Sequence, residues 1–543
     1  MIRFERFGRR TFAWARTLGM ATILINAFFF TACTRRNQVD YGLPLNQTLR
    51  WNIETEPPTL DWTLMSDTTS SRIADAMMDG LVRYGFKNGK VQVSPDLAVS
   101  WRPSNHMKTW TFTLRQGVKW TDGVPFTGQQ IIDSWQRLLN PKTGALYASY
   151  LFVIKNAKAY FEGKIKNFSE VGVKLNKKGQ LIVTLARPES FFPAILGNEC
   201  TFPIRKDVIA KWGNHWTEPS HIQTLGAYKL IKWAHGKAVV LQRNDGYFGH
   251  KPEVKYILGL VIQDQSTALS MFNRGELDAL DEIPSDDIRT VRTMPQYRKV
   301  TTLGVYYFGF NVKMPPLNNV KVRQAINMAI NRDQINKIMG GTELPATTFI
   351  PPGLVGYNPN IGPKYNPAKA RKLLDEAGYK NRSKFPRLKI AFNTNENHER
   401  IAEIIQEQLK TNLGINVELT NEEWKTYLRT LQAKGYPMFR FGWIADYPDA
   451  NTFMNLFESD NANNDTNWAS KKYDHLVREA ATVMSDQKRQ KLYDQAQKLL
   501  LDTDSVVVPI YFYRSQYLVN SRIKNYPLNS LLKFYPQKME IVQ

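Results

Sequence analysis

The chain has 543 residues, 43% of them hydrophobic and 22% charged, which is enough for three or four domain-sized units with buried cores. Its formal net charge of +23 is dispersed along the sequence and accompanies no nucleic-acid-binding motif. We therefore expect no nucleic-acid partner, and interpret the charge as a source of solubility and of attraction to an anionic membrane surface.

The first 33 residues are typical of an export signal. Five arginines surround the start of this segment, and an apolar run over residues 18–30 follows that is too short to span a membrane comfortably. The run leads into Thr31-Ala32-Cys33, and small residues directly before a cysteine are typical of a lipoprotein signal. We expect residues 1–32 to be a signal peptide and Cys33 to be lipidated. The alternative is an ordinary secretory signal cut nearby, and Arg9-Arg10 also resembles a twin-arginine signal.

The cysteine count limits how the exported chain is stabilised. Cys33 and Cys200 are the only two cysteines, and if Cys33 carries lipid, no intramolecular disulfide is available. Neither cysteine has a zinc-binding spacing to others or to histidines. We therefore expect a fold held together by its hydrophobic core, without a bound metal.

The first half of the body alternates between patterns of strands and helices. A polar tether at 34–48 precedes a strand at 49–53, and a helix from Ser70 presents Ile73, Ala76, Met77 and Leu81 on one face. Trp110, Phe112 and Leu114 alternate as in a strand. Thr127 then begins a helix whose apolar side comprises Ile131, Ile132, Trp135, Leu138 and Leu139.

The second half contains a clear βαβ pattern. Residues 322–339 read as one helix that Gly340-Gly341 ends, and Asn366-Pro367 begins another helix that stops at Gly378. Strands at 388–392 and 415–419 flank a helix over 401–409, which predicts a parallel sheet. Because no flexible linker divides the body, we expect domains that interleave.

Motifs of common enzymes are absent from the sequence. It contains no GxSxG elbow, no HExxH, no Walker A loop and no GxGxxG after a strand, and its seven histidines have no triad-like or metal-like spacing. Paired carboxylates such as Asp375-Glu376 fall on a solvated helix face. We expect neither an enzyme nor a cofactor.

Several motifs resemble the extracytoplasmic solute-binding proteins, family 5, of peptide and nickel ABC importers. They are Glu56–Asp61, Pro95–Trp101, Thr109–Gly123, Ser134–Leu139, Asn311–Asp333 and Asn366–Tyr379. Within the family, Ala145–Tyr150 and Gly442–Tyr447 resemble the oligopeptide-binding branch. The resemblance covers nearly all of the chain after Cys33.

The resemblance implies an α/β, two-lobed periplasmic-binding-protein fold with an extra inserted domain. Lobe I would comprise 34–78, 201–303 and 513–543, domain II would comprise 79–200, and lobe III would comprise 304–512. The ligand would be enclosed between lobes I and III by hinge closure. Some relatives carry a disulfide in lobe III, and the matching positions here are Gly304 and Ile444.

The resemblance also assigns residues to a peptide site. Asp446 would bind the peptide α-ammonium, since burying that group unpaired is prohibitive. Arg440 and His398 would serve the far carboxylate of short peptides. Main-chain pairing would come from Gly442–Ile444 and from Ser66–Thr68, including Thr68.

Cleft aromatics would be Tyr147, Trp443, Tyr511 and Tyr513. Simpler interpretations remain open, with Asp446 as a turn residue, His398 as a helix-start residue, and Tyr511 and Tyr513 as core residues.

We therefore expect a monomeric, lipid-anchored protein on the outer side of a bacterial membrane. It would bind short oligopeptides and deliver them to the permease of an ABC importer. Alternatives are a binding protein for a murein-derived peptide or a metal complex, a peptide sensor without transport, and a peptide hydrolase, which a turnover assay would identify.

Overall fold

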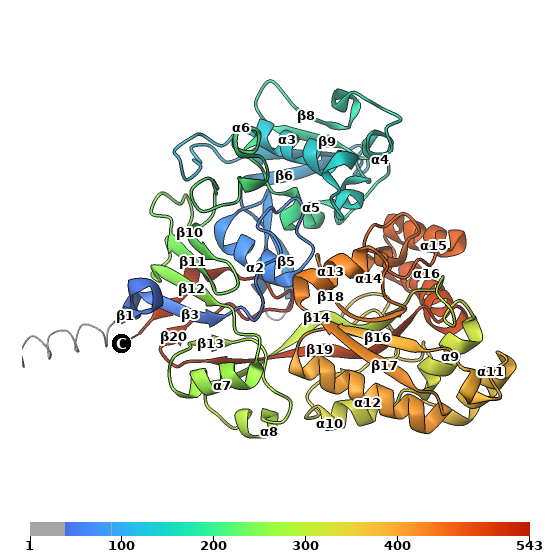
Figure 1. Ribbon diagram of the computed structural model, residues 1–543. Coiled ribbons are helices and arrows are strands. Elements are labelled where there is room, and N and C mark those ends of the chain that lie inside the picture. The colour runs from blue at the N-terminus through green and yellow to red at the C-terminus, as the bar shows by residue number, and fades with distance from the viewer. Residues whose placement is uncertain (1–37, 88–89, 543) are drawn as a thin grey trace, which may run out of the picture.

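The computed structural model describes residues 38–87 and 90–542 (Figure 1). The proposed signal peptide and Cys33 therefore lie outside the described residues. The main element is an 11-stranded sheet. Its strands are, in order, β10 (Tyr228–Ala234), β11 (Ala238–Arg243), β12 (Tyr256–Leu260), β3 (Thr48–Asn52), β13 (Ala279–Leu280), β19 (Val507–Val519), β14 (Tyr297–Phe310), β18 (Met438–Ile444), β16 (Leu388–Asn393) and β17 (Val417–Glu422), with β15 (Leu344–Pro345) paired to β19.

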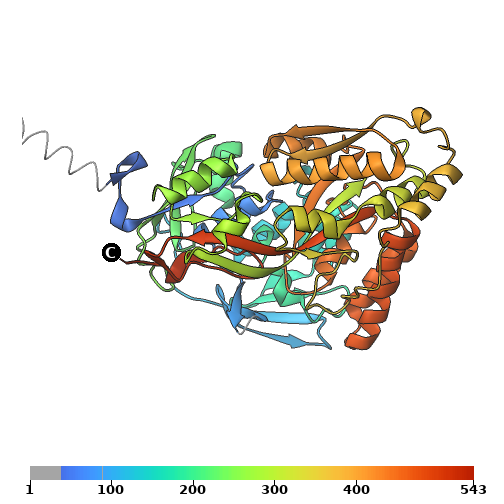
Figure 2. The same cartoon turned by 90° about the horizontal axis from the view of Figure 1, so that it is seen from below.

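Two long antiparallel strands join the two ends of this sheet. Figure 2 shows β14 and β19 running from one half of the molecule to the other. Their register shifts between Thr301 and Val305, so the ladder is interrupted there. The interruption falls at the predicted lobe boundaries of 303/304 and 512/513. Those boundaries stay predictions, but an interrupted ladder is a place where a bend disturbs few ladder bonds.

The two ends of the sheet carry different helices. The end with β3 and β12 is accompanied by α7 (Gln265–Asn273) and α8 (Ile288–Val291). At the other end, β16 and β17 pair in parallel through α12 (Glu396–Leu413), which confirms the predicted βαβ unit. The helices of that end are α9 (Val320–Ala329), α10 (Arg332–Ile338), α11 (Pro367–Glu376), α13 (Trp424–Gln432), α14 (Asn451–Met454), α15 (Lys471–Thr482) and α16 (Asp486–Lys498).

A separate four-stranded sheet lies above these two ends in Figure 1. Its strands are β6 (Ala98–Ser104), β7 (Thr109–Leu114), β9 (Leu181–Thr184) and β8 (Val173–Leu175). The predicted alternation in β7 is confirmed, because Trp110, Phe112 and Leu114 are all buried. A capping box between Thr127 and Gln130 begins α3 (Gly128–Leu138), as the sequence indicated. These elements fall within the predicted domain II.

The remaining described elements complete the chain. The helices are α2 (Thr68–Met77), α4 (Ala157–Phe161), α5 (Phe192–Ile195) and α6 (Lys206–Trp212). The strands are β1 (Gln38–Val39), β2 (Leu43–Pro44), β4 (Val82–Lys87), β5 (Lys90–Pro95), β20 (Ile523–Lys524) and β21 (Glu540–Ile541).

Two predicted helices had the wrong limits. The helix expected over 322–339 is two helices, α9 and α10, because Ile330 is extended and the Asn331 side chain caps α10 by accepting from the Gln334 N–H. The helix expected from Ser70 is α2, which Asp67 caps three residues earlier. It ends at Met77, so Leu81 is buried but not helical.

The positions implied for a disulfide face each other across two strands. Gly304 on β14 is directly opposite Ile444 on β18. A Cβ atom added to Gly304 would lie 2.5 Å from Ile444 Cδ1, so the isoleucine side chain occupies the space that a second side chain would need. Cys200 is a free, buried thiol. Among the described residues this pair of strands is held by its ladder and by packing.

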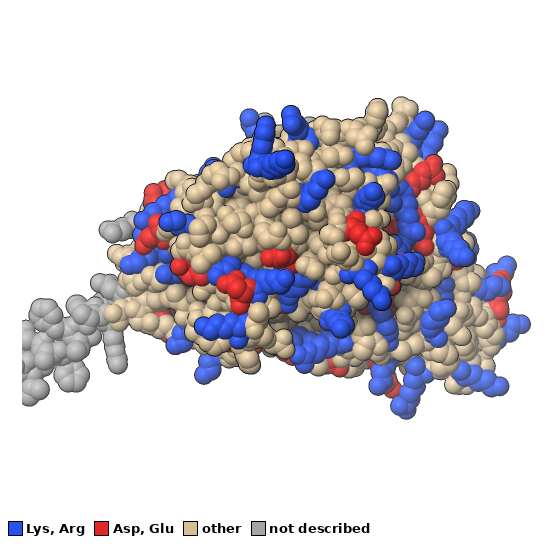
Figure 3. Space-filling view, turned by 90° about the horizontal axis from the view of Figure 1, so that it is seen from above, with Lys and Arg blue, Asp and Glu red and all other residues tan. Residues whose placement is uncertain are grey.

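The surface carries many positive charges. Figure 3 shows Lys and Arg side chains spread over the face seen from above, among fewer Asp and Glu. Within 38–87 and 90–542, no helix combines the length and the apolar character needed to cross a membrane.

Candidate ligand-binding cleft

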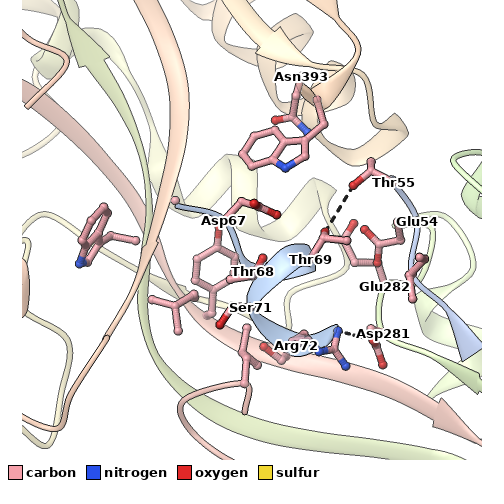
Figure 4. A pocket seen from close by; sticks show the side chains of 18 of the residues that line it. Glu54, Thr55, Asp67, Thr68, Thr69, Ser71, Arg72, Asp281, Glu282 and Asn393 are labelled. Atoms are coloured by element: carbon pink, nitrogen blue, oxygen red, sulfur yellow. Dashed lines mark hydrogen bonds and ion pairs between the residues drawn. The ribbon is translucent and has the colours of Figure 1, made fainter. Parts of the chain in front are cut away.

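A cavity of about 330 Å³ lies where the two ends of the large sheet and the four-stranded unit meet. Part of its lining is drawn in Figure 4. The lining segments come from every part of the chain and comprise 51–55, 65–69, 71–72, 147, 198–200, 263, 281–283, 343, 393–395, 397–398, 424, 440–446, 511, 513, 515–517 and 531–533. All ten residues assigned to the peptide site from the sequence lie on this wall.

Asp446 follows the end of β18 and is held by neutral donors. Its Oδ1 accepts from Asn198 Nδ2 at 3.2 Å and from the Tyr147 hydroxyl at 3.4 Å. Its Oδ2 accepts from Thr452 Oγ1 at 3.0 Å and from the Tyr150 hydroxyl. Among the described residues, no Lys, Arg or His nitrogen lies within 4.0 Å of this carboxylate. The site therefore fixes the orientation of an anion without neutralising it.

Burial raises the pKa of Asp446 to about 6, while the Tyr150 hydrogen bond and the more distant Lys533 oppose this shift. A ligand ammonium bound at Asp446 favours the charged carboxylate. Below pH 6 binding must therefore expel a proton, so affinity rises with pH through 6 and levels off above it.

We expect the affinity for trialanine to fall by up to about tenfold per pH unit below pH 6, with little change between about pH 6.5 and 7.5. Calorimetry across this range measures the slope. In Asp446→Asn the slope should disappear, and an unchanged slope in that variant would assign the pH dependence to another group.

Arg440 lies on β18 itself and is the positive counterpart of Asp446. Its Nη1 donates to Asn393 Oδ1 at 3.1 Å, its Nη2 donates to the Tyr513 hydroxyl at 3.1 Å, and its guanidinium lies 4.5 Å from the Tyr306 ring centroid. No carboxylate oxygen of the described chain comes within 4.0 Å of it. Arg440 is thus a buried cation with neutral partners only.

His398 lies beside Arg440 but does not add a second charge. It is 6% exposed, in the first turn of α12, and its Nδ1 is 3.5 Å from the Tyr306 hydroxyl. Burial and then the neighbouring Arg440 lower the pKa of His398 well below its usual value. The His398 ring can therefore form a hydrogen bond with a ligand, but it does not supply the second positive charge that the resemblance implied.

The cavity wall on β18 leaves room for a ligand backbone. Arg440, Gly442 and Ile444 share one face of the strand, because alternate residues point the same way. A Cβ atom on Gly442 would lie 2.3 Å from the Tyr513 hydroxyl, so only glycine permits the Tyr513–Arg440 bond in this arrangement. Tyr511 and Tyr513 are half-buried on this wall.

The other predicted residues also lie on the wall. The rings of Tyr147 and Trp443 stack 6.5 Å apart at the Asp446 end. Thr68 is exposed at the start of α2, facing the cavity (Figure 4). The binding roles of all these residues stay predictions.

Sequence analysis missed several residues of this site. Tyr150, Asn198 and Thr452 hold Asp446, but they come from three separate segments. Glu54 and Glu282 are among the further carboxylates that line the cavity (Figure 4). Of these residues, only Tyr150 could have been identified from the sequence, because it ends the motif Ala145–Tyr150.

Comparison with known proteins identifies the family. The family model described as bacterial extracellular solute-binding proteins, family 5 Middle, matches residues 92–465. The chain belongs to this family. The periplasmic oligopeptide-binding protein OppA of Salmonella typhimurium is 33% identical over 524 residues, which are 94% of each chain.

Solved structures of the family share the fold. The Haemophilus influenzae OppA complex with RPPGFSPFR matches with a TM-score of 0.86 and 29% identity, covering 93% of this chain and 100% of that one. The Escherichia coli murein tripeptide binding protein MppA matches with a TM-score of 0.87 and 31% identity, covering 92% and 99%. These matches confirm the predicted fold class.

The arrangement of the two ends of the sheet differs from that of an open relative. The unliganded open form of MppA gives a TM-score of only 0.62, against 0.87 for the other MppA structure. Contacts across the cavity agree with this difference. Asn397 of α12 donates to the Ile283 carbonyl at 3.1 Å and accepts from the Ser285 N–H at 3.0 Å, and Ser266 donates to Glu396 at 3.1 Å.

Proposed function

We propose that this solute-binding protein captures short peptides by their two charged ends. The observation that carries this is the pair of uncompensated charges in one cavity, the Asp446 carboxylate and the Arg440 guanidinium, each with neutral partners only. Isolated buried charges are costly to a fold. A zwitterionic ligand with an ammonium at one end and a carboxylate at the other satisfies both.

The spacing along the chain suits a ligand of a few residues. Arg440 lies on β18 and Asp446 lies two residues beyond its end, so a separation of six residues places their Cα atoms at most roughly 20 Å apart, before the side chains reach inward. A three-residue peptide spans about 10 Å. Between the two ends, the edge of β18 at Gly442 is not paired with β16, so it offers main-chain groups that every peptide can pair with.

The wider role follows from the family. The related OppA proteins are named as periplasmic oligopeptide-binding proteins, and this supports an extracytoplasmic chain that presents peptides to an ABC importer permease. We propose that it works as a monomer and carries out no covalent chemistry. The functional step is capture and release.

Hinge closure is expected to accompany binding. The register interruption near Thr301 lies between the two ends of the sheet, and the contacts of Asn397 with the 283–285 segment form only when these ends meet. Solution scattering should show a smaller radius of gyration with saturating trialanine than without it. The Asp446→Asn variant at the same peptide concentration is the control and should stay expanded. An identical profile for the wild type with and without peptide would contradict the proposal.

Lipid anchoring at Cys33 is a separate proposal, supported by the residues before it and by the polar sequence directly after it. The tether expected over 34–48 is wrong in its later part, because Leu43 is buried in a hydrophobic cluster and Thr48 begins β3. Two acyl chains hold a protein stably on a membrane. The Cys33→Ala variant should therefore move from the membrane fraction to the soluble fraction, while Cys200→Ala should not. Intact mass of the mature protein tests the same point, and a mature N-terminus elsewhere without acyl mass would disprove it.

A further inference from the structure

Two carboxylates in the cleft have no cation to balance them. Glu54 follows β3, and neither oxygen of its side chain has a hydrogen-bond partner or a cation within 4.0 Å among the described residues. Glu282 accepts hydrogen bonds at Oε2 only, from Gln265 Nε2 at 2.6 Å and from Asn395 Nδ2 at 2.8 Å. Figure 4 shows Glu54 and Glu282 close together on one side of the cavity.

The nearest cation on this side is already engaged. Arg72 forms an ion pair with Asp281, which also accepts from Trp51 Nε1 at 2.6 Å and from the Tyr526 hydroxyl at 3.0 Å. Asp281 is therefore satisfied, and Arg72, which is paired with it, forms no ion pair with Glu54 or Glu282. The acidic pair remains as an excess of negative charge inside a chain whose overall charge is positive.

Glu54 and Glu282 are close enough to Arg440 to interact electrostatically with it, but they form no ion pair with it. Burial and then Glu282 and Asp281 raise the pKa of Glu54, while Arg72 and then Arg440 lower it. For Glu282 burial again raises the pKa, and Asn395 and Arg440 lower it. Arg440 itself is 8% exposed, and its buried Nε has no hydrogen-bond partner. Arg440, Glu54 and Glu282 therefore line the same cavity, near enough for their charges to interact but too far apart to form an ion pair.

We propose that this part of the cavity receives a C-terminal peptide residue with a cationic side chain, whose α-carboxylate binds Arg440 and whose side-chain ammonium or guanidinium binds Glu54 and Glu282. The proposal rests on the proposed function, since it needs a peptide in the cleft. One residue carries both charges from the same Cα, so it satisfies the Arg440 donor and the two carboxylates together. Peptides ending in a neutral residue satisfy only Arg440, and leave the half-buried acidic pair without a cation.

Titration calorimetry with three peptides tests this specificity. Ala-Ala-Lys carries the cation at the C-terminus, Ala-Ala-norleucine is its uncharged analogue of similar shape, and Lys-Ala-Ala carries the cation at the other end. The variants are Glu54→Gln and Glu282→Gln. The control is Glu403→Gln, which removes the same charge from an exposed position on α12 outside the cavity.

We expect the wild type to bind Ala-Ala-Lys about tenfold or more tighter than Ala-Ala-norleucine, and tighter than Lys-Ala-Ala. This preference should fall below about threefold in Glu54→Gln and weaken in Glu282→Gln, while both bind Ala-Ala-norleucine at least as well as the wild type does. Glu403→Gln should keep the full preference.

Other outcomes separate the two proposals. If the wild type binds Ala-Ala-Lys and Ala-Ala-norleucine equally, or if the preference survives both substitutions, the cationic subsite is wrong while peptide binding stands. If Lys-Ala-Ala binds more tightly than Ala-Ala-Lys, the acidic pair recognises the N-terminal residue, and the proposed C-terminal subsite is wrong. If none of the three peptides binds, the proposed function fails and this inference fails with it.

Discussion

Replacing Asp446 by asparagine is expected to weaken trialanine binding by roughly 2–5 kcal/mol, or about thirty-fold to several thousand-fold. Asparagine keeps the shape, and its one oxygen can still accept from Asn198 while its amide donates to the hydroxyls of Tyr150 and Thr452. What is lost is the charge that meets the peptide ammonium in a site shielded from water, where the attraction is strong. Calorimetry at pH 7 measures the change.

Asp449→Asn is the matched control for this substitution. Asp449 is three residues further along and pairs with Arg489, and it does not line the cavity. The control variant should bind trialanine within about twofold of the wild type, because no ligand charge depends on it. A similar loss in both variants would indicate that the effect of Asp446→Asn arises from a disturbed local fold.

Substitution of Arg440 by glutamine should have a comparable effect, but one that depends on peptide length. The variant loses the cation that meets the carboxylate of a short peptide, and it removes the positive charge of Arg440 from the neighbourhood of Glu54 and Glu282, which repel that carboxylate. We expect a loss of roughly 2–5 kcal/mol for trialanine and a smaller loss for a hexapeptide, whose carboxylate lies beyond Arg440.

Trialanine amide tests the contact between Arg440 and the peptide carboxylate separately. It lacks the terminal carboxylate, so it should bind the wild type weakly and should lose little more on Arg440→Gln. Calorimetry on the wild type and the variant with all three ligands gives the comparison. Equal losses for trialanine, its amide and the hexapeptide would remove Arg440 from carboxylate recognition.

Local features of the fold were predictable where short-range chemistry decides them. Asn366-Pro367 begins α11 as expected, because capping by the Asn side chain and the fixed backbone angle of Pro act within one turn. The break between α9 and α10 was missed, since the apolar pattern continues through it. Tertiary bonds set the break, including those of Arg332 to the Pro509 carbonyl at 2.6 Å and to Asn327 Oδ1.

The site was predictable only where a continuous motif carries it. Arg440 and Asp446 are close in sequence, and a resemblance to relatives pointed to both. Glu54 and Glu282 are separated by more than 200 residues, and nothing in either local sequence indicates that β3 and the segment after β13 bring them to one cavity. The charge of a cleft is a property of the fold, and here it opposes the charge of the whole chain.

The most direct test of the account is a double-mutant cycle between Asp446 and the peptide ammonium. Calorimetry compares trialanine with N-acetyl-trialanine on the wild type and on Asp446→Asn. The account predicts that acetylation weakens binding to the wild type by about thirty-fold or more and adds little loss in the variant, because both changes remove the same interaction. Additive losses, or an acetylated peptide that binds the wild type as well as the free one, would contradict recognition of the peptide ammonium by Asp446.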